Sequence, residues 1–291
     1  MHRALVPLAL LVALTGCGGA RKPAAAPTGP PRLAFVDRHV PLGFTDEGQV
    51  ASHGAVRVIA VTYESLGKVL PAYLVEGPAR PNRPGIVVVH GSGGDRTELL
   101  PRAVALAERG AVALAITEPS SAYPLPQPTT MNALLRETRD GEVADVVAVR
   151  RAADVLGTLP DVGPRLGYLG WSAGAKTGTF VAASDHRFTA FALLSAGADP
   201  VSRFVAGSPP AYRAAVRRTL TTVDPLRYLR FARPGSVMLL DGSKDTVVPH
   251  EALENMIHAA PKGTTVRWFP TNHKLNDAAY AAAYRFLLAR T

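Results

Sequence analysis

Short, wholly apolar runs alternate with stretches of helical periodicity from about residue 85 to the end of the chain. Apolar runs of this kind, such as Ile86-Val87-Val88-Val89, are typical of strands that are buried on both faces of a sheet. The pattern predicts strands at 86–89, 111–116, 165–169, 188–194, 236–240 and 265–269, and helices at 97–109, 132–159 with a break near Gly141, 173–184, 251–259 and 275–289. This alternation predicts an α/β fold with a mainly parallel sheet and helices on both faces.

Two segments depart from the alternation. Residues 56–63 and 69–76 are β-rich runs joined by a polar stretch that contains Gly67, which predicts an antiparallel hairpin at the front of the sheet. Residues 199–234 are mostly helical in pattern, rich in Arg and longer than a crossover helix needs. We interpret this second segment either as a small helical cap over the strand ends or as a plain surface insertion.

The N-terminus has the pattern of a targeting segment. His2 and Arg3 precede a run of ten mostly apolar residues, which is too short to span a bilayer, and Leu14-Thr15-Gly16-Cys17 follows. This tetrapeptide resembles the lipobox of bacterial lipoproteins, although an ordinary signal peptide could carry a Cys there by chance. The resemblance implies a signal peptide at 1–16 and lipidation of Cys17. A Pro-, Gly- and Ala-rich tether over 17–32 and a folded domain over 33–291 would follow.

The same resemblance implies a location in the bacterial cell envelope. Gly18 follows the Cys, where an Asp would indicate retention in the inner membrane, so attachment to the outer membrane is favoured. Two or more acyl chains on Cys17 would give stable anchoring, whereas one chain binds a membrane only marginally.

Composition and charge exclude several classes of protein. The chain has 291 residues, of which 47% are hydrophobic, so a sizeable core is expected and disorder is not. A single Cys excludes an intrachain disulfide framework and a four-Cys zinc site. The net charge of +9 is spread over scattered Arg residues without interleaved aromatics, which argues against nucleic-acid binding. Binding to anionic surfaces remains a minor alternative.

The segment Gly170-Trp171-Ser172-Ala173-Gly174 is a G-x-S-x-G motif between a predicted strand and a predicted helix. A sharp turn at this place lifts the Ser side chain above the sheet edge, and small flanking residues make room for the turn. The helix N-terminus also favours developing negative charge. The alternative is a Gly-rich turn with an incidental Ser.

A second Gly-rich segment, His90-Gly91-Ser92-Gly93-Gly94, follows the predicted strand at 86–89. Its backbone N–H groups could approach a substrate oxygen closely, as an oxyanion hole requires. We expect the N–H groups of Ser92 and Ala173 to be the donors, with Gly93 as the alternative to Ser92. A phosphate-binding loop is less favoured, since the G-x-G-x-x-G pattern fails at Arg96.

An acid and a His follow the last two predicted strands. Asp245 is expected to orient the His, while Asp241 is expected to form local turn hydrogen bonds at its strand end. His273 lies on the loop after the final strand. The order Ser172, Asp245, His273, each after a successive C-terminal strand, is the order Ser…Asp…His found in one class of catalytic triad.

These motifs together resemble the α/β-hydrolase superfamily, and within it the dienelactone-hydrolase-like and acetyl-xylan-esterase-like branches, over about residues 56 to 291. The matching segments are HGSGG at 90–94, GWSAG at 170–174, GSKDTVVP at 242–249 and NH at 272–273. Dienelactone hydrolases proper use Cys as the nucleophile, whereas this chain has Ser172, which favours ester hydrolysis.

The resemblance implies an α/β-hydrolase fold and a serine hydrolase of carboxylic esters, with small or acetyl esters favoured. Ser172 would attack the acyl carbonyl, His273 would carry the proton, and Asp245 would fix the His tautomer. No cofactor or metal is implied, and the chain has no H-E-x-x-H motif. Two alternatives stay open: a catalytically silent binding lipoprotein with this fold, and a peptidase or thioesterase that uses the same triad.

Overall fold

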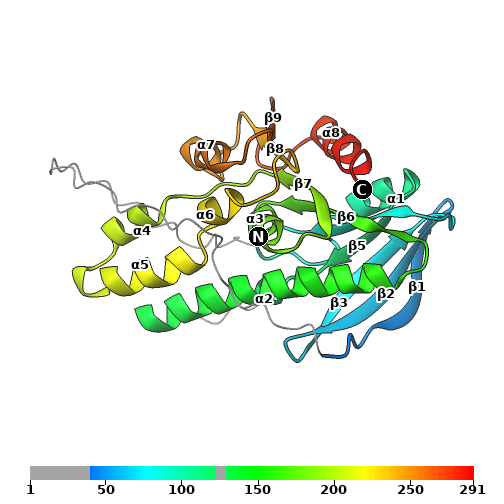
Figure 1. The fold of residues 1–291 in the computed structure, drawn as a ribbon, viewed down its shortest axis with the longest axis horizontal. Helices are drawn as coiled ribbons and strands as arrows, with labels where there is room; N and C mark the ends of the chain where they lie inside the picture. The colour runs from blue at the N-terminus through cyan, green and yellow to red at the C-terminus, as the bar shows by residue number, and fades with distance from the viewer. Residues whose placement is uncertain (1–39, 122–128) are drawn as a thin grey trace, which may run out of the picture.

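The computed structural model describes residues 40–121 and 129–291. The predicted signal peptide, Cys17, the tether and most of the Pro-rich stretch after Pro119 lie outside the described residues. The described chain folds around one nine-stranded sheet with the strand order β1-β2-β3-β5-β4-β6-β7-β8-β9 (Figure 1). The strands are β1 (Thr45–His53), β2 (Val56–Ser65), β3 (Lys68–Glu76), β4 (Arg83–Val89), β5 (Val112–Ile116), β6 (Val162–Trp171), β7 (Phe188–Leu194), β8 (Val237–Gly242) and β9 (Thr265–Phe269).

The sheet is mixed, as the sequence pattern predicts. β1, β2, β3 and β5 pair antiparallel in that order, and β2 and β3 form the predicted hairpin. From β5 through β4, β6, β7 and β8 to β9 all pairings are parallel. The carboxyl ends of the parallel strands therefore meet at one edge of the sheet, and the loops that follow β4, β6, β8 and β9 carry the candidate residues.

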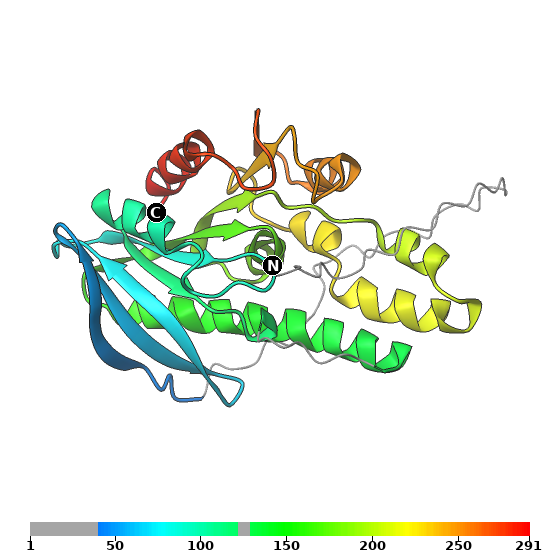
Figure 2. The ribbon, with the colours of Figure 1, turned by 180° about the vertical axis from the view of Figure 1, so that it is seen from behind.

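Helices cover both faces of the sheet (Figures 1 and 2). They are α1 (Leu100–Glu108), α2 (Met131–Thr158), α3 (Ala173–Ser184), α4 (Val201–Gly207), α5 (Arg213–Thr222), α6 (Pro225–Leu229), α7 (His250–Ala259) and α8 (Asp277–Leu288). Alternate residues of the buried strands face opposite layers, because side chains on a strand alternate. In β4, Val87 and Val89 pack in the layer of α2, α3, α6 and α7, whereas Ile86 and Val88 pack with α1 and α8.

Two features differ from the sequence-based expectation. The edge strand β1 is not predicted by the pattern, because all nine of its residues are exposed and its sequence, TDEGQVASH, is mostly polar. It forms by backbone pairing with β2 across a turn at Gly54, whose φ is +59°. The expected break near Gly141 is wrong, because α2 is continuous over 28 residues. Gly141 instead allows close packing, since a Cβ there would lie 3.3 Å from the Cβ of Ser120.

The 199–234 segment divides into two parts. α6 belongs to the main core, where Leu226, Tyr228 and Leu229 are buried. α4 and α5 pack instead against the first turns of α2, around a separate small cluster of Leu135, Val205 and Val216. Both views show α4, α5 and the start of α2 extending together from one end of the molecule (Figures 1 and 2). We call this unit the helical extension.

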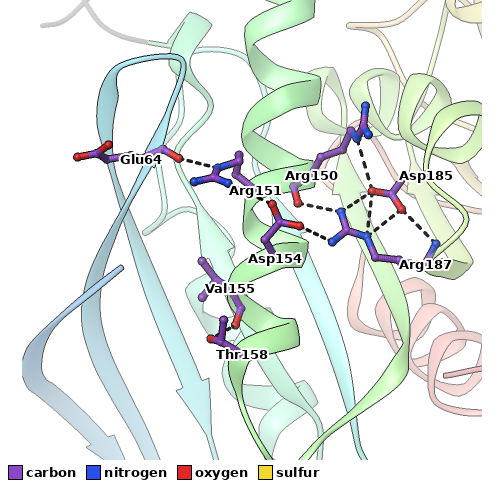
Figure 3. A network of polar contacts seen from close by, with 8 residues as sticks. All are labelled: Glu64, Arg150, Arg151, Asp154, Val155, Thr158, Asp185 and Arg187. Atoms are coloured by element: carbon purple, nitrogen blue, oxygen red, sulfur yellow. Dashed lines mark hydrogen bonds and ion pairs between the residues drawn. The ribbon is translucent and has the colours of Figure 1, made fainter. Parts of the chain in front are cut away.

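A network of charged side chains fastens the other half of α2 to the sheet layers (Figure 3). Arg187, between α3 and β7, donates to Asp154 of α2 at 2.5 Å and to Asp185 at 2.6 Å. Burial alone raises the pKa of Asp185, but the hydrogen bonds and charge of Arg187 outweigh it and lower that pKa. Arg151 donates to the backbone oxygen of Glu64 at 3.0 Å, which ties the hairpin to the same helix. The long helix α2 is thus bound to β2 and to the segment between α3 and β7.

No helix in the described part of the chain is long and apolar enough to cross a membrane.

Candidate active site

Ser172 occupies a strained turn between β6 and α3. Its φ of +55° and ψ of −114° lie in a region that residues with a Cβ rarely adopt. Such backbone strain costs about 1–3 kcal/mol and is often found at functional sites. The flanking glycines are required by close packing: a Cβ on Gly170 would lie 2.5 Å from the oxygen of Gly174, and one on Gly174 would lie 2.5 Å from the oxygen of His90. The motif therefore has the strand–turn–helix setting that its sequence predicts.

The structure brings Ser172, His273 and Asp245 into one chain of hydrogen bonds. Nε2 of His273 lies 3.0 Å from Oγ of Ser172, and Nδ1 lies 2.8 Å from Oδ2 of Asp245. The side chain of Asp245 is only 1% exposed, and its other oxygen accepts the N–H groups of Val247 at 2.8 Å and Val248 at 3.0 Å. A carboxylate beside Nδ1 requires the proton there, so Nε2 is left as the acceptor for the Ser172 hydroxyl.

Close packing between two loops holds the acid and the His in place. A Cβ on Gly242 would lie 2.5 Å from the backbone oxygens of both Thr271 and Asn272, so only glycine fits there. The N–H of Ser243 donates to the oxygen of Phe269 at 2.8 Å, and the N–H of Lys244 donates to the oxygen of Thr271 at 3.0 Å. The glycine of the GSKD segment thus allows the loops after β8 and β9 to meet.

Asp241 does not form the local turn hydrogen bonds that the sequence analysis expects. It is 2% exposed, and its Oδ1 has no hydrogen-bond partner among the described residues. Burial, and then the nearby charge of Asp245, raises the pKa of Asp241 to about 7. The expectation fails because Asp241 is still within β8, paired with Trp268, and its side chain points into the protein.

The raised pKa of Asp241 gives a prediction for stability. Because the folded protein holds this proton more tightly than the unfolded chain, stability falls as pH rises from about 4 to 7. Relative to pH 4, the free energy of unfolding of the wild type at pH 8 should be lower by up to about 4 kcal/mol because of this group. Urea unfolding of Asp241→Asn should show a smaller loss between pH 5 and pH 8 than the wild type. An equal loss in both proteins would contradict the assignment.

His90 fixes the loop after β4. The sequence motif contains this residue but predicts no role for its side chain. His90 is 2% exposed, and its Nε2 accepts the N–H of Glu118 at 3.0 Å. Nδ1 therefore carries the proton and donates to the oxygen of Gly91 at 2.7 Å. Burial lowers the pKa of His90, in agreement with a neutral ring. Glu98 accepts the N–H of Gly91 at 3.1 Å and fixes the loop from its other side.

The expected oxyanion donors lie on adjoining backbone segments. The N–H of Gly174 donates to the oxygen of His90 at 3.0 Å, which joins the start of α3 to the loop after β4. Within the described ranges, the N–H groups of Ser92, Gly93 and Ala173 donate to no acceptor. The hydrogen bonds therefore leave the choice between Ser92 and Gly93 open.

Behind the first turns of α3 lies a group of charged side chains that the sequence analysis did not single out. Glu118, Asp145 and Glu142 surround Lys176, which pairs with Glu142. Burial raises the pKa of Glu118 well above its usual range and that of Asp145 to about 6. These residues follow β5 or lie within α2 and α3, and no local motif marks them. In the described ranges, no cluster of His, Cys, Asp or Glu has the arrangement to hold a metal ion.

Comparison with known proteins identifies the fold. No family model matches the sequence, and no curated protein matches it. Among solved structures, an acetyl xylan esterase from a Paenibacillus species superposes with a TM-score of 0.71 at 18% identity, covering 87% of this chain and 90% of that one. The chain has the α/β-hydrolase fold.

Two further α/β-hydrolase neighbours agree with this assignment. A cold-adapted esterase from an Arctic intertidal metagenomic library has a TM-score of 0.64 at 20% identity, covering 84% of this chain and 99% of that one. A protein named as a dienelactone hydrolase from Klebsiella pneumoniae has a TM-score of 0.61 at 17% identity, covering 81% and 98%. The predicted resemblance to the acetyl-xylan-esterase-like and dienelactone-hydrolase-like branches of the α/β-hydrolase fold is thus confirmed at the level of structure.

Proposed function

We propose that this α/β-hydrolase-fold protein hydrolyses carboxylic esters through an acyl-enzyme on Ser172. The observation that carries the proposal is the hydrogen-bonded chain from the Ser172 hydroxyl through His273 to the buried Asp245, with distances of 3.0 and 2.8 Å. Further support comes from the strained turn at Ser172 and from the N–H groups of Ser92, Gly93 and Ala173, which donate to no acceptor among the described residues. The esterase names of the structural neighbours agree with it.

In this mechanism, Ser172 Oγ attacks the acyl carbonyl while Nε2 of His273 accepts the hydroxyl proton. Asp245 holds the Nδ1 proton and stabilises the imidazolium that forms. The N–H of Ala173 and that of Ser92 or Gly93 bind the developing oxyanion. His273 then protonates the leaving alcohol. Water attacks the acyl-enzyme with His273 as the base, which releases the acid and restores Ser172.

A fluorophosphonate tests the nucleophile directly. We expect the intact mass of residues 18–291 to increase by one phosphonyl group, and we expect no such increase in Ser172→Ala. A Ser184→Ala variant, which removes another hydroxyl of α3, should be labelled like the wild type. A folded wild-type protein that fails to react would reject the proposal and favour the silent binding protein.

We propose small acyl groups, acetyl among them, as the substrates. The names of the acetyl xylan esterase neighbours support this choice. A series of p-nitrophenyl esters should show the highest kcat/KM at two to four acyl carbons. A preference for long acyl chains would contradict it, and faster cleavage of thioester or peptide analogues would favour the thioesterase or peptidase alternative.

We also propose that the chain is anchored in the cell envelope by lipid on Cys17. The support is the lipobox-like segment with the only Cys in the sequence. Cys17→Ala should leave ester hydrolysis unchanged and move the protein from the membrane fraction to the soluble fraction. Continued membrane association of this variant would contradict the anchor.

A further inference from the structure

We propose that Trp171 and Ser195 are positioning residues for His273, which they hold through its backbone carbonyl. Nε1 of Trp171 and Oγ of Ser195 each donate to the oxygen of His273, both at 3.0 Å. The inference rests on the proposed function of His273 as the base. It adds a role for Trp171, the variable residue before Ser172 in the G-x-S-x-G motif, and for Ser195 after β7, which lies in no motif.

The loop that carries His273 needs such support because of its place in the sheet. It follows β9, an edge strand that pairs only with β8 among the described strands. From there His273 must reach Ser172 at the end of β6, which is three strand positions away. That is about 14 Å at the usual strand spacing. Hydrogen bonds from Trp171 and Ser195 connect the loop directly to the central strands.

Ser195 is a buried residue with a strained backbone. It is fully buried, and its φ is +52°, although it is not glycine. Its N–H donates to the oxygen of Leu240 at 2.8 Å, so its backbone is fixed by β8. A glycine would relieve the strained φ but would lack the hydroxyl that serine supplies. That hydroxyl donates to His273.

Trp171 contacts His273 in a second way. Their ring centroids are 5.1 Å apart at an interplanar angle of 47°. Trp171 is 8% exposed, and its indole packs against the loop after β4, since a Cβ on Gly91 would come within 2.7 Å of it. The imidazole of His273 is thus hydrogen-bonded to Ser172 and Asp245 and contacts the ring of Trp171. The backbone oxygen of His273 accepts hydrogen bonds from Trp171 and Ser195.

The test removes each donor while keeping the fold. Trp171→Phe keeps the aromatic packing, and Ser195→Gly removes the hydroxyl while favouring the observed φ. We expect each variant to lower kcat for a p-nitrophenyl ester about tenfold with little change in KM, and the double variant about 100-fold. Urea unfolding should show that Ser195→Gly is at least as stable as the wild type.

Ser236→Ala is the matched control. Ser236 is also buried, and its hydroxyl also donates to a backbone oxygen, that of Arg233 at 2.7 Å. Ser236 lies just before the amino-terminal end of β8, whereas Ser172 and the His273 loop lie at the carboxyl ends of the strands. Loss of the Ser236 hydroxyl should therefore leave kcat unchanged. If Ser195→Gly retains full kcat, or if kcat in the three variants simply follows stability, the positioning role is rejected.

A measurement without turnover separates this inference from the proposed function. The Nδ1 proton of His273 should give a low-field NMR resonance in the wild type, which broadens by solvent exchange in Trp171→Phe and Ser195→Gly but not in Ser236→Ala. This holds even if the wild type fails to react with a fluorophosphonate. An unchanged resonance in both variants would overturn the inference, whatever the activity.

Discussion

Replacing His273 with alanine is expected to lower kcat for a p-nitrophenyl ester by about 10⁶-fold. The imidazole is the group within hydrogen-bond distance of Ser172 Oγ that can accept its proton, at 3.0 Å. Without it the hydroxyl keeps its proton and remains a weak nucleophile. The measurement is the steady-state rate of hydrolysis at saturating ester. The rate of a Ser172→Ala sample purified in the same way is subtracted as background.

The control for this variant is His258→Ala, which removes an exposed His from the last turn of α7. We expect it to keep the wild-type rate, because in the described part of the chain His258 forms no hydrogen bond with Ser172, Asp245 or His273. A loss below about 100-fold in His273→Ala would show that another group acts as the base. That result would exclude the proposed triad while leaving the fold assignment unaffected.

Replacing Asp245 with asparagine is expected to lower kcat by about 10⁴-fold. An amide can present its own N–H to the imidazole, which favours the tautomer whose Nε2 carries the proton and cannot accept one from Ser172. The carboxylate also stabilises the imidazolium formed during attack, and an amide has no charge to do so. Steady-state kinetics at saturating ester measure the loss.

Asp241→Asn provides the comparison, because both acids lie in the same strand-to-loop segment. Only Asp245 reaches His273, at 2.8 Å, so Asp241→Asn should change kcat less than tenfold. The two variants therefore distinguish the two carboxylates that the sequence offers. Similar losses in both would contradict the assignment of Asp245 as the orienting acid.

The main features of the fold and the triad were predictable because they depend on local patterns. Apolar runs mark most of the buried strands, and Ser172, Asp245 and His273 each lie within four residues of the end of a strand. In a parallel sheet such positions converge at one edge, so chain order was enough to bring them together. Gly170, Gly174 and Gly242 are then needed for close approach of the backbone, which is why glycines accompany the motif residues.

Features that depend on distant contacts were not predictable. β1 buries no apolar face, so no hydrophobic pattern marks it, and it is held in the sheet by backbone pairing with β2. Gly141 suggested a break in α2, but contacts of that helix with the rest of the protein outweigh the low helix propensity of one glycine. The roles of Trp171 and Ser195 arise from the position of the His273 carbonyl, 102 and 78 residues away in the sequence. No local spacing encodes these contacts.

The small core of the helical extension has a consequence for motion. In the described part of the chain, its cluster of buried side chains consists of Leu135, Val205 and Val216, whereas α6 and the rest of α2 belong to the main core. Local unfolding requires least free energy where few apolar side chains are buried. Amide hydrogens of α4 and α5 should therefore exchange with solvent well before those of β4 and β6. We therefore expect local opening of the helical extension to leave the hydrogen-bonded residues around Ser172 in place.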